Sequence, residues 1–141
     1  MKSIKDETFN ECTSINHLVL PTYVETIGKK AFYRNSLTEL SVPATCNLID
    51  EDAFDVEGVN SITLLTLLGS DTAGELTIID DDNFQSVTSL NLDRHLSSEC
   101  TTPVFEAIEG ASIGSHVKRI STVPFKGSKI EKLYLNLVYQ K

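Results

Sequence analysis

The pattern that predicts this fold is contained in Val24-Glu25-Thr26-Ile27-Gly28-Lys29-Lys30-Ala31-Phe32. Val24 is followed three positions later by Ile27, and Ile27 is followed five positions later by Phe32. Self-similarity of this kind indicates a chain built from stacked repeats. The same spacing occurs as Met1-x-x-Ile4 before Phe9, Cys46-x-x-Ile49 before Phe54, Leu76-x-x-Ile79 before Phe84, and Val117-x-x-Ile120 before Phe125.

A second motif, aliphatic-x-x-Leu-x-aliphatic, follows each phenylalanine. It is found as Ile15-Leu18-Leu20, Leu37-Leu40-Val42, Ile62-Leu65-Leu67, Val87-Leu90-Leu92 and Ile130-Leu133-Leu135. Around Phe105 lies a weaker copy, with Leu96 and Cys100 before the ring and Ile108-Ala111-Ile113 after it. All six phenylalanines are therefore in register, and the repeats span residues 1–20, 24–42, 46–67, 76–92, 96–113 and 117–135.

These repeats predict a single, mainly β domain over residues 1–141. Each copy is too small to bury its own apolar face, so its stability must come from stacking on its neighbours. The alternation of Leu-x-Leu is the period of a strand, which places Leu18 and Leu20 inside and Val19 outside. The phenylalanines are expected to form a column inside the stack, and helices are expected to be scarce. Cys12 and Cys46 fall on apolar positions of the repeat and are predicted to be buried free thiols.

The stretch Val24–Phe32, followed by the strand motif and Pro43, resembles the BspA-like leucine-rich repeats. That family has a strand, a proline, Val-x-x-Ile-Gly and then Ala-Phe. The position of Gly28 is taken by Asp50, Asp80 and Ser121 in later copies, which are residues that tolerate turns. The resemblance implies a right-handed leucine-rich-repeat solenoid of about six coils of short parallel strands. It also implies a non-catalytic module for protein-protein interaction or adhesion.

Family resemblance further implies a location on the cell surface or outside the cell, and a protein partner in the host matrix or on a cell surface. Two alternatives stay open. The chain could be a structural spacer within a larger surface protein, and its first residues contain no signal peptide, which leaves a cytoplasmic location open. Neither end of the chain has an atypical polar copy that would cap the stack. The sequence therefore predicts either a piece of a longer array or association of the exposed ends with another chain.

Parallel pairing of the strands would place their outward side chains in rows along the stack. A row that ends in a tyrosine is a plausible contact surface, because tyrosine is enriched at binding hot spots. The alternative is a solvated ladder of hydrogen-bonded Ser, Thr and Asn side chains. The candidate binding residues are His17, Glu39, Ser41, Thr66, Asn91, Ser112, Lys132 and Tyr134.

Twenty acidic and twelve basic residues give a formal net charge of −8. This charge opposes binding to nucleic acid, and no apolar run is long enough for insertion into a membrane. An acidic patch is predicted where two triplets share one repeat position, namely Asp50, Glu51, Asp52, Asp80, Asp81 and Asp82. The patch lacks the alternating ligands and turn glycine of a calcium loop, so a solvated ridge is favoured over a calcium-binding repeat. No metal site is predicted.

No catalytic motif is present. His17, His95 and His116 are isolated in the sequence, and neither a Gly-x-Ser-x-Gly elbow nor a phosphate-binding glycine loop occurs. The chain is therefore predicted not to be an enzyme and to need no cofactor.

Overall fold

The computed structural model describes residues 2–55, 61–79, 82–98, 104–120 and 123–136. Its regular elements are short strands and two 3₁₀ turns, in an order that follows the predicted repeats. They are β1 (Ser3–Ile4), β2 (Thr26–Ile27), β3 (Glu39–Val42), β4 (Leu48–Ile49), β5 (Leu64–Leu67), β6 (Thr77–Ile78), η1 (Asp82–Phe84), β7 (Ser89–Leu92), β8 (Gly110–Ile113), η2 (Val123–Phe125) and β9 (Lys132–Leu135).

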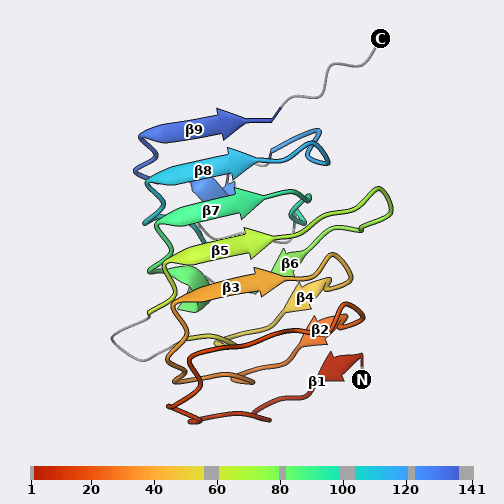
Figure 1. Ribbon diagram of the computed structural model, residues 1–141, viewed down its shortest axis with the longest axis vertical. Helices are drawn as coiled ribbons and strands as arrows, with labels where there is room; N and C mark the ends of the chain where they lie inside the picture. The colour runs from red at the N-terminus through yellow and green to blue at the C-terminus, as the bar shows by residue number, and fades with distance from the viewer. Residues whose placement is uncertain (1, 56–60, 80–81, 99–103, 121–122, 137–141) are drawn as a thin grey trace.

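The strands form two parallel sheets that run along the axis of a solenoid (Figure 1). The Val-x-x-Ile segments make the four-stranded sheet β1-β2-β4-β6, and the Leu-x-Leu segments make the five-stranded sheet β3-β5-β7-β8-β9. Each strand pairs with the equivalent strand of the next repeat. We call the six repeats, with the bounds given above, coil one to coil six in chain order. The predicted mainly β solenoid of parallel strands, with little helix, is confirmed.

The core lies between the two sheets. Strands β3, β5 and β7 bury every second residue, and Leu40, Leu65 and Leu90 occupy one row of the ladder. Parallel stacking places equivalent residues on top of one another, which is why one apolar position per repeat becomes a continuous internal row. The opposite residues of the same strands face solvent.

The phenylalanines form the predicted column, in two runs. The centroids of the Phe9, Phe32, Phe54 and Phe84 rings are separated successively by 5.2, 5.3 and 5.9 Å. Phe105 and Phe125 make a second, tilted pair at 5.2 Å. Among the described residues no ring contact joins Phe84 to Phe105, so the column is interrupted between coils four and five.

Coil one departs from the prediction because residues 14–20 form no strand. The backbone bond from the Ser36 N–H to the carbonyl of Ile15 is 2.8 Å long, and the Ser36 hydroxyl donates to the carbonyl of Thr13. Beyond these bonds, residues 16–18 diverge from β3 and leave a hollow beside it. This coil is packed on one side only, which allows it to splay. Cys12, predicted to be buried, is exposed in this coil, whereas Cys46 is buried in coil three.

Coil four also differs from its predicted register. Ile78, not Ile79, pairs with Ile49 and is buried, so the position of Gly28 is taken here by Ile79 rather than Asp80. Compared with coil two, coil four has one residue fewer between Leu76 and Ile78, and one residue more between Ile78 and Phe84. The two changes cancel, which is why the spacing in the sequence looked regular.

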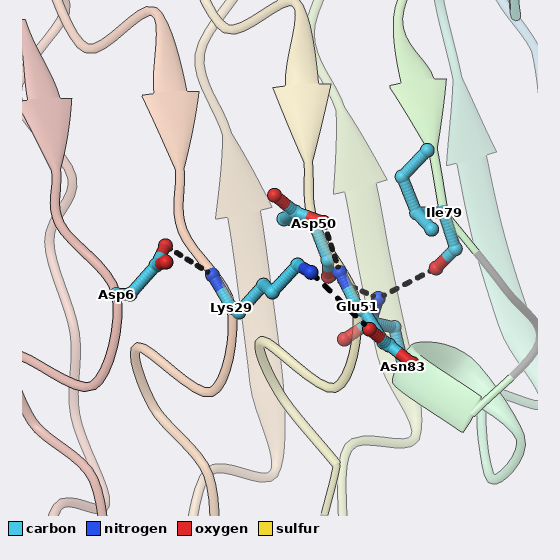
Figure 2. A network of polar contacts seen from close by, with 6 residues as sticks. All are labelled: Asp6, Lys29, Asp50, Glu51, Ile79 and Asn83. Carbon is cyan, nitrogen blue, oxygen red and sulfur yellow. Dashed lines mark hydrogen bonds and ion pairs between the residues drawn. The ribbon is translucent and has the colours of Figure 1, made fainter.

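The side chain of Asn83 restores the hydrogen bonds between coils three and four at this extra residue. Figure 2 shows Asn83 beside Asp50 and Ile79. In the preceding coils the N–H of Phe32 donates to the carbonyl of Ala53 at 2.8 Å. The N–H of Phe54 instead donates to the Oδ1 of Asn83 at 2.8 Å, and Asn83 Nδ2 donates to the carbonyls of Asp50 at 3.0 Å and Ile79 at 3.2 Å. The Asn83 side chain thus replaces a backbone group, and the residue is fully buried.

Left-handed residues that are not glycine occupy the corners before Phe9, Phe32 and Phe54 and the corners after Phe9 and Phe32. Their φ angles lie between 52° and 62°, and equivalent positions carry Glu7, Lys30 and Asp52, and then Glu11 and Arg34. Such a conformation costs roughly 1–2 kcal/mol per residue. It is held by backbone hydrogen bonds to the next coil, such as that from the Arg34 N–H to the carbonyl of Asp55 at 2.8 Å.

Residues 68–75 form a long loop between coils three and four, here called the inserted loop, and Arg94 fills the space behind it. The Arg94 guanidinium donates to the carbonyls of Pro43, Ala44 and Gly74 at 3.3, 3.2 and 2.8 Å. Arg94 is only 2% exposed, and burial lowers the pKa of its guanidinium. Its side chain therefore joins the loop to the link between coils two and three.

Candidate protein-interaction surface

The outer face of the five-stranded sheet carries the two predicted rows from β3 to β9. One ladder of paired residues is Glu39, Leu64, Ser89, Gly110 and Lys132, and the other is Ser41, Thr66, Asn91, Ser112 and Tyr134. All of these residues are exposed or half-buried. Asn91 Nδ2 donates to the Thr66 hydroxyl at 3.2 Å, so this part of the row is a hydrogen-bonded ladder of side chains.

His17 does not join these rows. It belongs to the segment of coil one that forms no strand, and its side chain is exposed. Together with Glu39, Ser41 and Thr66 it lines the hollow between coil one and β3. The predicted row therefore begins at β3 rather than in coil one.

A groove of about 410 Å³ lies at the carboxyl end of strands β5 to β9. Thr66, Asn91, Ser112 and Tyr134 line its floor, and Asp93 and Asn136 lie where the strands end. Tyr134 is 62% exposed. The groove thus combines hydroxyl and amide groups with one exposed aromatic ring, which are the side-chain types that protein interfaces use.

The acidic triplet of coil three is described in full, whereas that of coil four is described only in part. Glu51 pairs with Lys29 at 3.7 Å, and the Glu51 N–H donates to Asp50 Oδ1 at 2.7 Å (Figure 2). Asp80 and Asp81 lie outside the described residues, and Asp82 begins η1. Within the described ranges, no group of three or more acidic, histidine or cysteine side chains could hold a metal ion.

The links between coils bring together charged groups that are distant in the sequence, which the sequence analysis missed. Asp93 lies in the link after β7, and its Oδ1 accepts the His116 N–H from the next link at 3.0 Å. His116 Nδ1 lies 2.7 Å from Asp93 Oδ2, and Nε2 lies 3.2 Å from Asp71 of the inserted loop. The links share one register, so this register was the signal that could have predicted the cluster.

Two glycines allow the backbone to approach Asp93 this closely. A Cβ atom added to Gly69 would lie 1.6 Å from the Asp93 carbonyl oxygen, and one added to Gly114 would lie 2.1 Å from Asp93 Oδ1. Neither separation is sterically possible. Glycine at both positions is therefore a condition for the contact between the inserted loop, Asp93 and the link that carries His116.

The two histidines of these links have pKa values shifted in opposite directions. Both ring nitrogens of His116 face carboxylates, and the hydrogen bond to Asp93 raises its pKa, with a further contribution from Asp71. Burial, together with Arg119 and Lys118, lowers the pKa of His95, although Glu75 opposes this. His95 Nε2 accepts the Lys118 N–H at 2.9 Å, which requires that nitrogen to be unprotonated.

We expect the stabilisation by His116 to be lost as the pH rises. Its folded-state pKa lies above the ordinary value of 6.5, so the stabilisation is fully present below that value and disappears as the pH passes through the folded pKa. The loss of melting temperature caused by His116→Ala should therefore be larger at about pH 5.5 than at about pH 9.

His17→Ala is the matched control, because His17 is exposed and lies outside the cluster. Its effect on the melting temperature should not grow at acid pH. If His116→Ala destabilises the protein equally at both pH values, the ion pairs with Asp71 and Asp93 do not contribute as described.

The fold and this face define a β-solenoid repeat protein with a polar lateral surface. The chain belongs to the BspA-type leucine-rich repeat family: the family model described as "BspA type Leucine rich repeat region (6 copies)" matches residues 1–102. Beyond residue 102, β8 and β9 continue the parallel register of β7. No curated protein and no solved structure matches the chain. In the part of the chain that the structure describes, no helix has the length and apolar character needed to span a membrane.

Proposed function

We propose that this protein is a non-catalytic recognition module that binds another protein through the outer face of strands β3, β5, β7, β8 and β9. The observation that carries the proposal is the continuous row from Ser41 to Tyr134, whose members from Thr66 to Tyr134 line the groove. BspA-type repeat proteins are typically surface or secreted proteins that act through protein-protein contacts. A protein of the host matrix or of a cell surface is therefore the partner class that we propose.

The chemistry of the row supports binding of a protein rather than of a small molecule. The groove is shallow and follows the sheet, whereas small-molecule sites are concave and enclose most of the ligand. Hydroxyl and amide side chains at successive strands offer hydrogen bonds at intervals of about 5 Å, which suits an extended polypeptide surface. Tyr134 supplies an apolar contact at one end of the row.

We expect the triple variant Asn91→Ala, Ser112→Ala and Tyr134→Ala to bind its partner about tenfold more weakly or worse, with the fold intact. Binding would be measured by surface plasmon resonance on immobilised protein, against purified matrix proteins and cell-surface extracts. Circular dichroism and the melting temperature would show that the fold is retained.

The matched control changes the outer row of the other sheet, with Ser3→Ala, Thr26→Ala and Thr77→Ala. These residues are equivalent positions of β1, β2 and β6, and Thr26 donates to Ser3 as Asn91 does to Thr66. The control should bind like the wild type. Equal loss in both variants would contradict the assignment of the face, and a wild-type protein that binds none of the probes would favour a spacer.

Contact between copies of the chain through the ends of the stack is the second part of this proposal. It uses the exposed ends of the first and last coils rather than the outward rows of the five-stranded sheet.

A further inference from the structure

We propose that copies of this chain bind one another head to tail, with coil six of one copy covered by coil one of the next. This inference extends the self-association part of the proposed function. Leu135 of coil six also lines the groove on the five-stranded sheet, whereas Leu133 does not, so a variant at Leu133 lets the two proposals fail independently.

Coil six exposes side chains that are buried in every preceding coil with the same strand. Leu133 and Leu135 of β9 are 53% and 52% exposed, whereas the equivalent Leu90 and Leu92 of β7 are each 2% exposed. In the inner coils these positions are covered from both sides along the stack. Further exposed apolar residues of coil six are Ile120 and Val123.

Coil one presents the other half of the same contact. Phe9 stacks on Phe32 but is still 39% exposed, because nothing covers its second face among the described residues. Ile15 and Leu18 are only partly buried. Phe9 and Phe125 occupy the same place in the repeat, so docking of coil one on coil six would continue the column of rings from one copy into the next.

The direction of the backbone hydrogen bonds favours contact of unlike ends. At the corners, the N–H of the phenylalanine in one coil donates to the residue before the phenylalanine in the following coil. The pairs are Phe9 to Ala31 at 2.8 Å, Phe32 to Ala53 at 2.8 Å and Phe105 to Pro124 at 3.0 Å. The carbonyl of Thr8 holds this acceptor position in coil one and has no backbone partner among the described residues. A coil six placed before coil one would therefore meet an acceptor at the position that its phenylalanine N–H requires.

Charge favours the same arrangement. Coil six carries five basic residues and one acidic residue, whereas coil one carries two basic and three acidic residues. Two copies of coil six would repel each other, and a coil one placed on coil six would not. The basic residues are Lys118, Arg119, Lys126, Lys129 and Lys132, and the acidic residues of coil one are Asp6, Glu7 and Glu11.

Analytical ultracentrifugation of the wild-type chain tests the proposal. Unlike ends do not close a ring of two, so the average mass should rise with concentration beyond that of a dimer, and the association should weaken with added salt. A wild-type chain that remains monomeric into the millimolar range would overturn the proposal.

Two variants that each block one end make the test specific. Leu133→Glu places a charge in the contact of coil six at a residue that does not line the groove, and should weaken association by about a hundredfold or more. Glu7→Lys with Glu11→Arg reverses the charge of coil one using the residues that coil two already carries at these positions, Lys30 and Arg34. Each variant alone should be monomeric, and an equimolar mixture should form a 1:1 dimer and nothing larger.

Leu68→Glu is the matched control, because Leu68 is a leucine of the inserted loop that is 45% exposed and belongs to neither end. It should associate like the wild type, and all variants should keep the wild-type circular dichroism spectrum. Self-association of either blocked variant alone would indicate like-to-like contacts and overturn the head-to-tail arrangement. A mixture that stays monomeric would overturn it as well.

Discussion

Phe54→Ala is expected to destabilise the folded protein by about 3–5 kcal/mol, through lost burial and the cavity that remains. Phe54 is 0% exposed and lies between the rings of Phe32 and Phe84, at 5.3 and 5.9 Å. A small domain has a total stability of only about 5–15 kcal/mol, so the variant should unfold or aggregate near physiological temperature. Urea denaturation followed by circular dichroism would measure the loss.

Asn91→Ala is the control for this prediction. Its side chain lies on the outer face and makes one exposed hydrogen bond to Thr66. The expected change in the free energy of unfolding is within about 0.5 kcal/mol. Similar denaturation midpoints for the two variants would show that the ring column does not support the fold.

Asn83→Leu is expected to cost about 2–4 kcal/mol, because it leaves buried backbone groups without partners. The lost bonds are those to the Phe54 N–H and to the carbonyls of Asp50 and Ile79. Leucine has a similar volume and would fill the space, so the loss reports on hydrogen bonding more than on packing. Asn47→Ala, an exposed asparagine of coil three, should have little effect.

Asn83→Asp separates the accepting role of this side chain from its donating role. The carboxylate can still accept the Phe54 N–H, but it faces the carbonyls of Asp50 and Ile79 with no proton to donate. Protonation of the carboxyl restores one donor, so the stability gap to the wild type should narrow as the pH falls from neutral and be smallest below about pH 4, where the carboxyl is protonated in both states. The gap of Asn83→Leu should not change in this way. If both gaps respond equally to pH, Asn83 does not bridge the ladder.

The strand register and the ring column could be predicted because they depend on single positions per repeat. In a parallel stack an inward residue contacts its own equivalents, so Leu40, Leu65 and Leu90 had to share a row once the motif was aligned. The same alignment predicted that Thr66 and Asn91 lie side by side on the outer face. These predictions needed only the period and the alternation of apolar residues.

The details of coil four could not be predicted in this way. Two adjacent isoleucines, Ile78 and Ile79, both fit the motif, and the total spacing from Leu76 to Phe84 equals that from Val24 to Phe32. The one available signal was Asn83, a polar residue at the position where Ala31 and Ala53 precede the ring in other coils. A buried amide at an apolar position indicates a backbone group that has lost its partner.

The polar clusters escaped prediction for a different reason. Asp71 joins Asp93 and His116 only because one loop is longer than the others and folds back over the links. The period of the repeat says where a link lies but not how far an inserted loop reaches. The splayed segment of coil one was also beyond the motif, since its sequence matches that of coils that do form strands.

The left-handed corners make one side of this molecule unusually free to change its chemistry. Glu7, Lys30 and Asp52 share a backbone conformation and an equivalent place, yet they differ in charge and length. Backbone bonds to the next coil hold Glu7 and Lys30 in that conformation, because their N–H groups donate to the carbonyls of Lys29 and Glu51 at 2.8 and 3.1 Å. Substitutions at these corners can therefore change the charge of this edge while the backbone stays the same. One scaffold can in this way present many different surfaces.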